Sequence, residues 1–386
     1  MKYKFSILLF FIVVCSFGQE QFRITHGPYI QDLDQKSVTI VWTTNKDAVS
    51  WVELAPDDST HFYLKERPKY FSAELGSKEV SKVHSIRVSN LAPGTKYRYR
   101  IYSREVLKHE GHRLQYGSVT ATDVFGVKPL EFTTIDQTKD NLTFLMVNDI
   151  HGNKDLLENL LKKADFGHAD FILFNGDMAS EFRSEDQVFG DFMDTAVRLF
   201  AKEKPMYYCR GNHETRGNFA NEFLRYFPSP SGKLYYLLRE GPVCFLMLDC
   251  GEDKPDSDIE YSGIAAYDQY RDTETNWLKE ALKSREFTES LFKIVVVHMP
   301  PFGGWHGDDE IAKKFVPALN DAGIDVMLCG HMHEYIRQDR KAGINFPVIV
   351  NSNKTILKAV YNSRVLDMKI LNEKGEPIDS MKIMKN

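Results

Sequence analysis

The sequence predicts an all-β sandwich followed by an α/β domain. Short β-branched and aromatic segments without helical periodicity fill residues 22–135, and beyond residue 141 strand-like segments alternate with amphipathic helical ones. The chain has 386 residues, which exceeds one ordinary domain. Its content of 42% hydrophobic and 27% charged residues is typical of globular proteins. Two folded domains in series are therefore expected.

The N-terminal domain, residues 22–135, is predicted from the regular spacing of its strand-like segments, which turn-forming residues separate. The predicted strands are residues 37–44, 49–54, 84–89, 96–102 and 130–133. The turn segment from Leu91 to Tyr97, Leu-Ala-Pro-Gly-Thr-Lys-Tyr, resembles the connection between two strands of fibronectin type III domains. Residues 103–129 are polar and irregular, which indicates a long loop or a lateral hairpin.

The second domain is predicted over residues 141–360, where strands alternate with helices. The predicted strands are residues 142–147, 171–174, 206–209, 243–248, 293–297 and 325–328. The predicted helices are residues 154–163, 185–201, 273–282 and 308–322. Residues 361–386 contain two alternating segments around Asn372-Glu-Lys-Gly375 and are expected to form a β-hairpin tail.

The first 18 residues are typical of a secretory signal peptide. Lys2 and Lys4 precede an apolar run that ends at Cys15, and small residues at 16 and 18 favour cleavage after Gly18. The apolar run is shorter than the roughly 18 residues of a membrane-spanning helix, and no later segment could cross a bilayer. A lipoprotein anchor at Cys15 is the less favoured alternative, because Val14 is a poor fit before it. We therefore predict an exported protein, whether periplasmic, extracellular or tethered to the surface.

Charge and cysteine content narrow the choice of function. The formal net charge of -5 provides no basic surface for nucleic acid. The cysteines after the leader are Cys209, Cys244, Cys250 and Cys329. Cys244 and Cys250 cannot pair if one strand contains both, since extended chain holds them about 20 Å apart. Buried free thiols are expected.

Acidic, amide and imidazole side chains follow five of the predicted strands. They lie in Asp149-Ile-His151-Gly, Gly176-Asp177, Gly211-Asn212-His213-Glu214, His298 and Gly330-His331-Met-His333. One such residue alone is more often a hydrogen-bonded polar group, but five clusters at equivalent strand ends predict a shared site. Their oxygen and nitrogen donors suit divalent Mn, Fe or Zn, and seven ligands are too many for one tetrahedral ion. Two metal ions that share a carboxylate are therefore predicted.

The order of these motifs resembles that of the calcineurin-like metallophosphoesterases, and the preceding β-sandwich resembles the purple acid phosphatase branch. The resemblance implies a central β-sandwich flanked by helices. It implies that the first metal is bound by Asp149, His151 and His333, the second by Asn212, His298 and His331, and both by Asp177. It also implies that His213 faces the phosphate, with Glu214 as its orienting partner, and that Asn212 contacts substrate. His306, in the loop after His298, is a candidate phosphate contact, with a surface histidine as the open alternative.

A small phosphorylated substrate follows from this resemblance, and hydrolysis of a phosphate monoester by a metal-bridging hydroxide is the predicted reaction. No Ser, Cys or Asp in the motifs is placed as a covalent nucleophile. A phosphodiesterase of the same fold is the alternative. A surface-binding protein with an inactive second domain is disfavoured, because all seven ligand positions are intact.

One position departs from the purple acid phosphatase pattern. In that family, a tyrosine three residues after the bridging aspartate binds ferric iron and gives the purple colour. Here the position holds Ser180, and His151 joins the first metal site instead. Replacement of a phenolate by a neutral imidazole should favour divalent ions over Fe(III).

Overall fold

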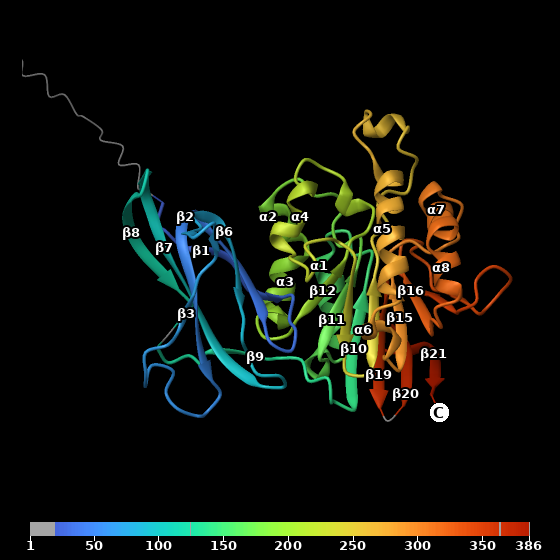
Figure 1. The fold of residues 1–386 in the computed structure, drawn as a ribbon, viewed down its shortest axis with the longest axis horizontal. Coiled ribbons are helices and arrows are strands. Elements are labelled where there is room, and N and C mark those ends of the chain that lie inside the picture. The colour runs from blue at the N-terminus through green and yellow to red at the C-terminus, as the bar shows by residue number, and fades with distance from the viewer. Residues whose placement is uncertain (1–19, 124, 363, 386) are drawn as a thin grey trace, which may run out of the picture.

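A computed structural model describes residues 20–123, 125–362 and 364–385. The predicted signal peptide of residues 1–18, with the alternative anchor at Cys15, lies outside the described residues. A β domain and a larger α/β domain lie side by side (Figure 1). Among the helices described, none has the length and apolar character needed to cross a membrane.

The β domain is organised around one long strand, β2 (Val38–Pro56). Its first half pairs with β1 (Ile24–Gln31) and β6 (Ser81–Val88), and its second half pairs with β7 (Lys96–Glu110). The predicted strands 37–44 and 49–54 are thus parts of one strand. Its pairing with β6 shifts register between Thr43 and Ala48. The fully buried Trp42 donates from its indole Nε1 to Ser103 Oγ of β7 at 2.9 Å, which ties the two halves together.

The remaining strands complete this domain. They are β3 (Lys69–Tyr70), β4 (Ala73–Glu74), β5 (Ser77–Lys78), β8 (Arg113–Ala121) and β9 (Leu130–Thr133). β7 and β8 form an antiparallel hairpin within residues 103–129, so the lateral hairpin, and not the loop, is the correct alternative for this segment.

Two mixed sheets, each of six described strands, form the centre of the α/β domain. The first has the order β12 (Met206–Cys209), β11 (Phe171–Asn175), β10 (Asn141–Val147), β19 (Thr355–Asn362), β20 (Val365–Asn372), β21 (Pro377–Met384). The second has the order β13 (Tyr236–Glu240), β14 (Val243–Met247), β15 (Phe292–Val296), β16 (Val326–Cys329), β18 (Val348–Val350), β17 (Ile336–Gln338). Their inner faces share one apolar core, in which Phe144 and Phe245 meet edge to face with ring centroids 5.0 Å apart.

Helices cover the outer faces of both sheets (Figure 1). The first is covered by α1 (Lys154–Lys163), by a run of α2 (Glu185–Val188), η2 (Phe189–Met193), α3 (Asp194–Ala196) and η3 (Val197–Ala201), and by α4 (Phe223–Tyr226). The second is covered by α5 (Tyr267–Ala281), α6 (Arg285–Thr288), α7 (His306–Lys314) and α8 (Val316–Asn320). Short 3-10 turns are η1 (Phe166–His168), η4 (His213–Thr215), η5 (Ala220–Glu222) and η6 (Ile259–Tyr261).

Two helices differ from their predicted bounds for local reasons. α5 begins six residues before the predicted residue 273, because Asp256 accepts hydrogen bonds from the backbone N–H groups of Tyr267 and Asp268 at 2.8 and 3.1 Å. That carboxylate satisfies the exposed N–H groups of the first turn from outside the helix. The predicted helix 308–322 is divided into α7 and α8, and Pro317 lies in the first turn of α8.

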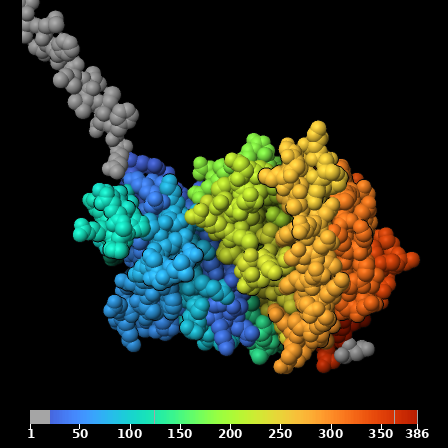
Figure 2. All heavy atoms as spheres, turned by 45° about the horizontal axis from the view of Figure 1, so that its top comes forward, coloured from blue at the N-terminus to red at the C-terminus, as the bar shows by residue number. Residues whose placement is uncertain are grey.

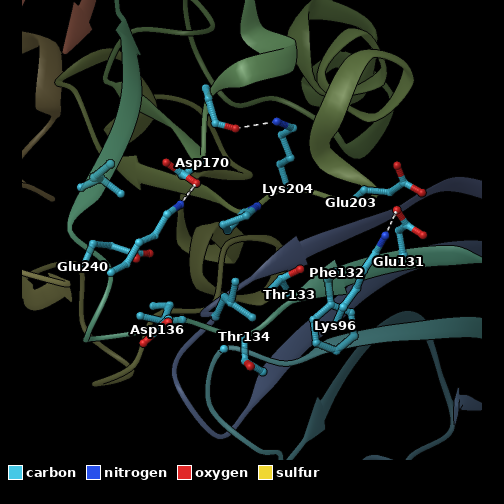
Figure 3. A pocket seen from close by; sticks show the side chains of 17 residues that line it. Lys96, Glu131, Phe132, Thr133, Thr134, Asp136, Asp170, Glu203, Lys204 and Glu240 are labelled. Carbon is cyan, nitrogen blue, oxygen red and sulfur yellow. Dashed lines mark hydrogen bonds and ion pairs between the residues drawn. The ribbon is translucent and has the colours of Figure 1, made fainter. Parts of the chain in front are cut away.

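The two domains meet along one continuous seam, which is visible where blue and green atoms touch (Figure 2). Tyr29 and Tyr99 of the β domain donate hydrogen bonds to the carbonyls of Tyr226 and Lys202. A cavity of about 570 Å³ opens at the seam (Figure 3). The lysines that line this cavity have polar partners, for example Lys96, whose Nζ lies 2.6 Å from Glu131 Oε1. None of the seven predicted metal ligands is among the described residues that line it.

The C-terminal hairpin completes the first sheet, because β20 pairs with β19 along its whole length. Leu366 of β20 is fully buried in the core between the sheets, whereas Ile378 of β21 is 48% exposed. We expect Leu366→Ala to lower the free energy of unfolding by about 2–5 kcal/mol, through lost burial and a residual cavity. The control Ile378→Ala should stay within about 0.5 kcal/mol of wild type. Urea denaturation measures both, and equal values would contradict this packing.

Candidate metal centre

All seven predicted ligands gather where strands of both sheets end. Asp149 and His151 follow β10, Asp177 follows β11 and Asn212 follows β12. His298 follows β15, while His331 and His333 follow β16. Parallel pairing of β10 with β11, of β11 with β12, and of β15 with β16 brings these carboxyl ends to one edge.

Three overlapping groups of side chains could each hold a metal ion, since their donor atoms lie within 4.8 Å of one another. The groups are Asp149 with His151 and His333, Asp177 with His298 and His331, and His151 with Asp177 and His213. The first two correspond to the two metal sites implied by the sequence resemblance. Asn212 belongs beside the second, because its Oδ1 lies 3.2 Å from His331 Nδ1.

The backbone is strained at most of these ligands. Positive φ angles of 48 to 73° occur at Asp149, His151, Asp177, His331 and His333. This left-handed conformation costs roughly 1–2 kcal/mol for a residue other than glycine, and such strain concentrates at functional sites. It turns the side chains inward after each strand, so five of the seven predicted ligands depend on it.

Three of the ligands, Asp149, His298 and His331, have one polar atom with a hydrogen-bond partner and another without. Asp149 Oδ2 accepts hydrogen bonds from Asn148 Nδ2 at 2.6 Å and from the backbone N–H of His331 at 2.9 Å. His298 Nδ1 donates to the carbonyl of Asn175 at 2.6 Å. The opposite atoms, Asp149 Oδ1 and His298 Nε2, are buried without a hydrogen-bond partner among the described residues, as is Nε2 of His331.

Unpartnered buried polar atoms are costly, so their convergence indicates a missing partner. His298 Nε2 lies 3.1 Å from Asp177 Oδ2 and 3.7 Å from Asp149 Oδ1, and His333 Nε2 lies 3.4 Å from Asp149 Oδ1. Carboxylate oxygens and imidazole nitrogens that face one another across this gap suit divalent cations. The donor set therefore fits two metal ions.

The charges in the cluster are strongly coupled. Burial alone would lower the pKa of His298, but the carboxylates of Asp177 and Asp149 outweigh it and raise that pKa to about 10. Burial and the neighbouring His298 lower the pKa of His331 to about 4. The two buried carboxylates thus favour positive charge beside them, and a cation bound at His298 Nε2 would take the place of the proton there.

Glu214 does not orient His213, contrary to the sequence-based expectation. Its fully buried carboxylate accepts hydrogen bonds from the backbone N–H groups of Asp177, Met178 and Gly211 at 2.7 to 2.9 Å, and from the Tyr208 hydroxyl at 2.8 Å. Gly211 has no room for a side chain, because a Cβ there would lie 2.2 Å from Asp177 Oδ1. Glu214 therefore fixes the loop that presents Asp177.

His213 is oriented by the main chain instead. Its Nδ1 lies 2.7 Å from the carbonyl of Ser180 and must donate its hydrogen there. Its backbone N–H donates to Asp177 Oδ1 at 3.0 Å, and its Nε2 lies 3.8 Å from Asp177 Oδ2. Nε2 therefore lies at the edge of the metal cluster, 3.2 Å from Nη1 of Arg216.

A layer of charged residues behind Asn212 was not among the predicted site residues. Asp253 Oδ2 accepts a hydrogen bond from Asn212 Nδ2 at 3.3 Å, and Arg216 binds Asp253 and Glu252. Glu252 and Asp253 lie in the loop after β14, a strand whose polar end was not assigned to the site. The strand-end rule that located the ligands would have found them.

His306 contacts a neighbouring helix, and its described side-chain partner is none of the seven ligands. It is the first residue of α7, and its Nε2 lies 2.8 Å from Asp268 Oδ1 of α5. Its contact with substrate stays a prediction.

Comparisons with known proteins agree with this geometry. The family model described as calcineurin-like phosphoesterase matches residues 142–335, which are just over half of the chain. The chain belongs to the calcineurin-like phosphoesterases. Its relatives in this family include purple acid phosphatase 18 of Arabidopsis thaliana, 23% identical over 83% of this chain and 68% of the relative. Purple acid phosphatase 1 of Ipomoea batatas is 22% identical over 86% and 67%.

A solved structure shares the fold of both domains of this phosphoesterase. Purple acid phosphatase PPD1 from yellow lupin (Lupinus luteus) seeds superposes with a TM-score of 0.66 at 14% sequence identity. The match covers 92% of this chain and 74% of the lupin chain. The predicted β domain followed by a phosphoesterase domain of two sheets flanked by helices is thereby confirmed.

We predict that the active, metal-loaded phosphoesterase is nearly colourless. Ser180 provides no phenolate, and the hydroxyl of Tyr335, the next tyrosine along from His333, donates to Asp379 Oδ2 at 2.5 Å in the C-terminal hairpin. A visible spectrum and a metal analysis of the same active sample test this prediction. An intense purple band would mean that a tyrosine binds the metal and that the first ligand set is wrong.

Proposed function

We propose that this calcineurin-like phosphoesterase hydrolyses phosphate monoesters with the help of two divalent metal ions, Mn, Fe or Zn. One observation carries this proposal: the unpartnered atoms of Asp149, His298 and His331 converge on one gap, beside Nε2 of His213. Export from the cytoplasm, which rests on residues 1–18, is part of the same proposal.

The seven side chains would divide between the two ions. Asp149, His151 and His333 would hold one ion, and Asn212, His298 and His331 the other. Asp177 faces both groups, since its Oδ2 lies 3.1 Å from His298 Nε2 and 4.0 Å from His151 Nε2. Such ions, when bound, supply an activated water and neutralise charge on the phosphate.

His213 is the residue that we assign to proton transfer. Donation from its Nδ1 to the Ser180 carbonyl fixes the ring, so the exchangeable proton is held at Nε2, on the side of the cluster. From there it would protonate the leaving oxygen or stabilise charge on the transferring group. A positioned acid of this kind contributes roughly a hundredfold or more to the rate.

Water is the nucleophile that this site favours. The free thiols of Cys209, Cys244, Cys250 and Cys329 are buried, and burial raises the pKa of each, so none is a reactive thiolate. Asp149 and Asp177, the buried acids of the cluster, are already assigned to the metals. Direct hydrolysis without a covalent intermediate is therefore proposed.

Activity assays with and without metal test this function. We expect exhaustive chelation to abolish hydrolysis of p-nitrophenyl phosphate, and Mn, Zn or Fe to restore it. The matched diester, bis(p-nitrophenyl) phosphate, should be the poorer substrate. Full activity in a demonstrably metal-free sample would refute the metal requirement, and a strong preference for the diester would make the protein a phosphodiesterase.

Two variants separate metal binding from proton transfer. We expect Asp177→Asn to lose bound metal and activity together, because this carboxylate faces both groups. His213→Ala should keep both metals but lower kcat by roughly a hundredfold or more. Metal content measured beside the rate distinguishes them. If His213→Ala empties the site, His213 is a metal ligand and its assigned role is wrong.

A further inference from the structure

Arg216 is the one arginine in contact with His213 among the described residues. It lies three residues after His213, just beyond the 3-10 turn η4, and its side chain is 28% exposed. Its Nε donates to Glu252 Oε1 at 2.8 Å, and its Nη2 donates to Glu252 Oε2 at 3.0 Å and to Asp253 Oδ1 at 3.1 Å. One edge of the guanidinium is thus fully occupied by carboxylates.

The other corner of the guanidinium, Nη1, faces the imidazole of His213. Nη1 lies 3.2 Å from Nε2 and 3.4 Å from Nδ1 of that ring. An atom in the ring plane at these two distances would collide with Cε1, so Nη1 must lie over a face of the ring. A ring face is no substitute for an oxygen acceptor, and no oxygen of a described residue accepts from Nη1. An anionic oxygen beside His213 could therefore accept from Nη1 in place of these ring contacts.

The position of Arg216 is rigid. Its carbonyl accepts a hydrogen bond from the backbone N–H of Phe182 at 2.8 Å. The next residue, Gly217, has a φ of 92°, and a Cβ there would lie 2.1 Å from the Phe182 carbonyl oxygen. The side chain is held by Glu252, which also accepts from the Tyr261 hydroxyl at 2.9 Å. A fixed donor of this kind recognises an anionic oxygen with little loss of conformational entropy.

We propose that Arg216 binds a non-bridging phosphate oxygen of the substrate through Nη1 and is the residue that selects monoesters over diesters. This inference rests on the proposed phosphoesterase function. A monoester has three non-bridging oxygens, and a diester has two. Two of them are the oxygens that two cations would contact, so the third is present only in the monoester. A donor placed beside His213 meets that third oxygen.

The selection acts over a short distance rather than through the net charge of the region. Glu252 and Asp253 together outweigh the charge of Arg216, so this group of three residues does not attract anions by its overall field. Arg216 would therefore select its ligand through the directional hydrogen bond from Nη1. A hydrogen bond from a charged donor is stronger than one between neutral groups.

Paired substrates with the same leaving group test this role. Arg216→Gln should lower kcat/KM for p-nitrophenyl phosphate by roughly tenfold to a hundredfold, as for loss of one charge-stabilising donor. The same variant should lower kcat/KM for bis(p-nitrophenyl) phosphate by less than about threefold, since the diester lacks the third oxygen. Arg285→Gln, which removes an exposed arginine of α6 paired with Glu289, is the matched control and should change neither value.

Arg216→Lys keeps the experiment decisive if Arg216→Gln does not fold. A lysine retains the charge beside Glu252 and Asp253, but its single ammonium group cannot bind both carboxylates and the phosphate as the guanidinium does. Arg216→Lys should therefore lower kcat/KM for p-nitrophenyl phosphate more than kcat/KM for bis(p-nitrophenyl) phosphate. It should also weaken the binding of inorganic phosphate to metal-loaded protein, measured by calorimetry, by roughly tenfold.

Three results would overturn the assignment. An equal fall on both substrates, or a loss of bound metal, would make Arg216 a structural residue that acts through His213 or Asn212. Unchanged phosphate affinity in Arg216→Lys would do the same. If wild-type protein hydrolyses neither substrate, the proposed function fails, and the phosphate affinity of the variants alone then decides the role of Arg216.

Discussion

Two buried carboxylates whose charge the surrounding protein only partly balances set the central constraint on this structure. Asp149 and Asp177 are 2% and 1% exposed, and both lie within 4 Å of the buried imidazole of His298. Ionised carboxylates at such a depth are tolerated only beside positive charge. His298, whose pKa these acids raise, carries part of that charge as a proton on Nε2, and a cation bound there would replace that proton.

The surrounding fold keeps these groups together against their repulsion and strain. The two sheets share one core, so strand ends from both reach the same edge. Glu214 fastens the loops after β11 and β12 by accepting from their backbone N–H groups, while Asp253 fixes the amide of Asn212. The positive φ angles of the ligands persist because packing and hydrogen bonds determine the backbone on both sides of each loop. Stability of the scaffold and geometry of the site are therefore linked.

Sequence patterns were sufficient for the fold class and for the residues that the structure brings together. The buried strands β10, β11, β14 and β15 are short, strongly apolar runs, and the residues that follow them are too polar to be ordinary strand ends. Local composition could not reveal that β2 is one strand, because the polar residues Asn45 to Asp47 within it have the composition of a turn. Nor could it reveal the partners of Glu214 or the cap that Asp256 provides for α5, since both depend on contacts between separate loops.

The central claim is that two cations occupy the gap between the two groups of ligands. Anomalous diffraction from crystals of the metal-loaded protein, collected at the absorption edge of the bound metal, tests it most directly. We expect two strong peaks, one beside Asp149, His151 and His333 and the other beside Asn212, His298 and His331, with Asp177 between them. A single peak, or peaks located elsewhere in the molecule, would contradict the two-metal site.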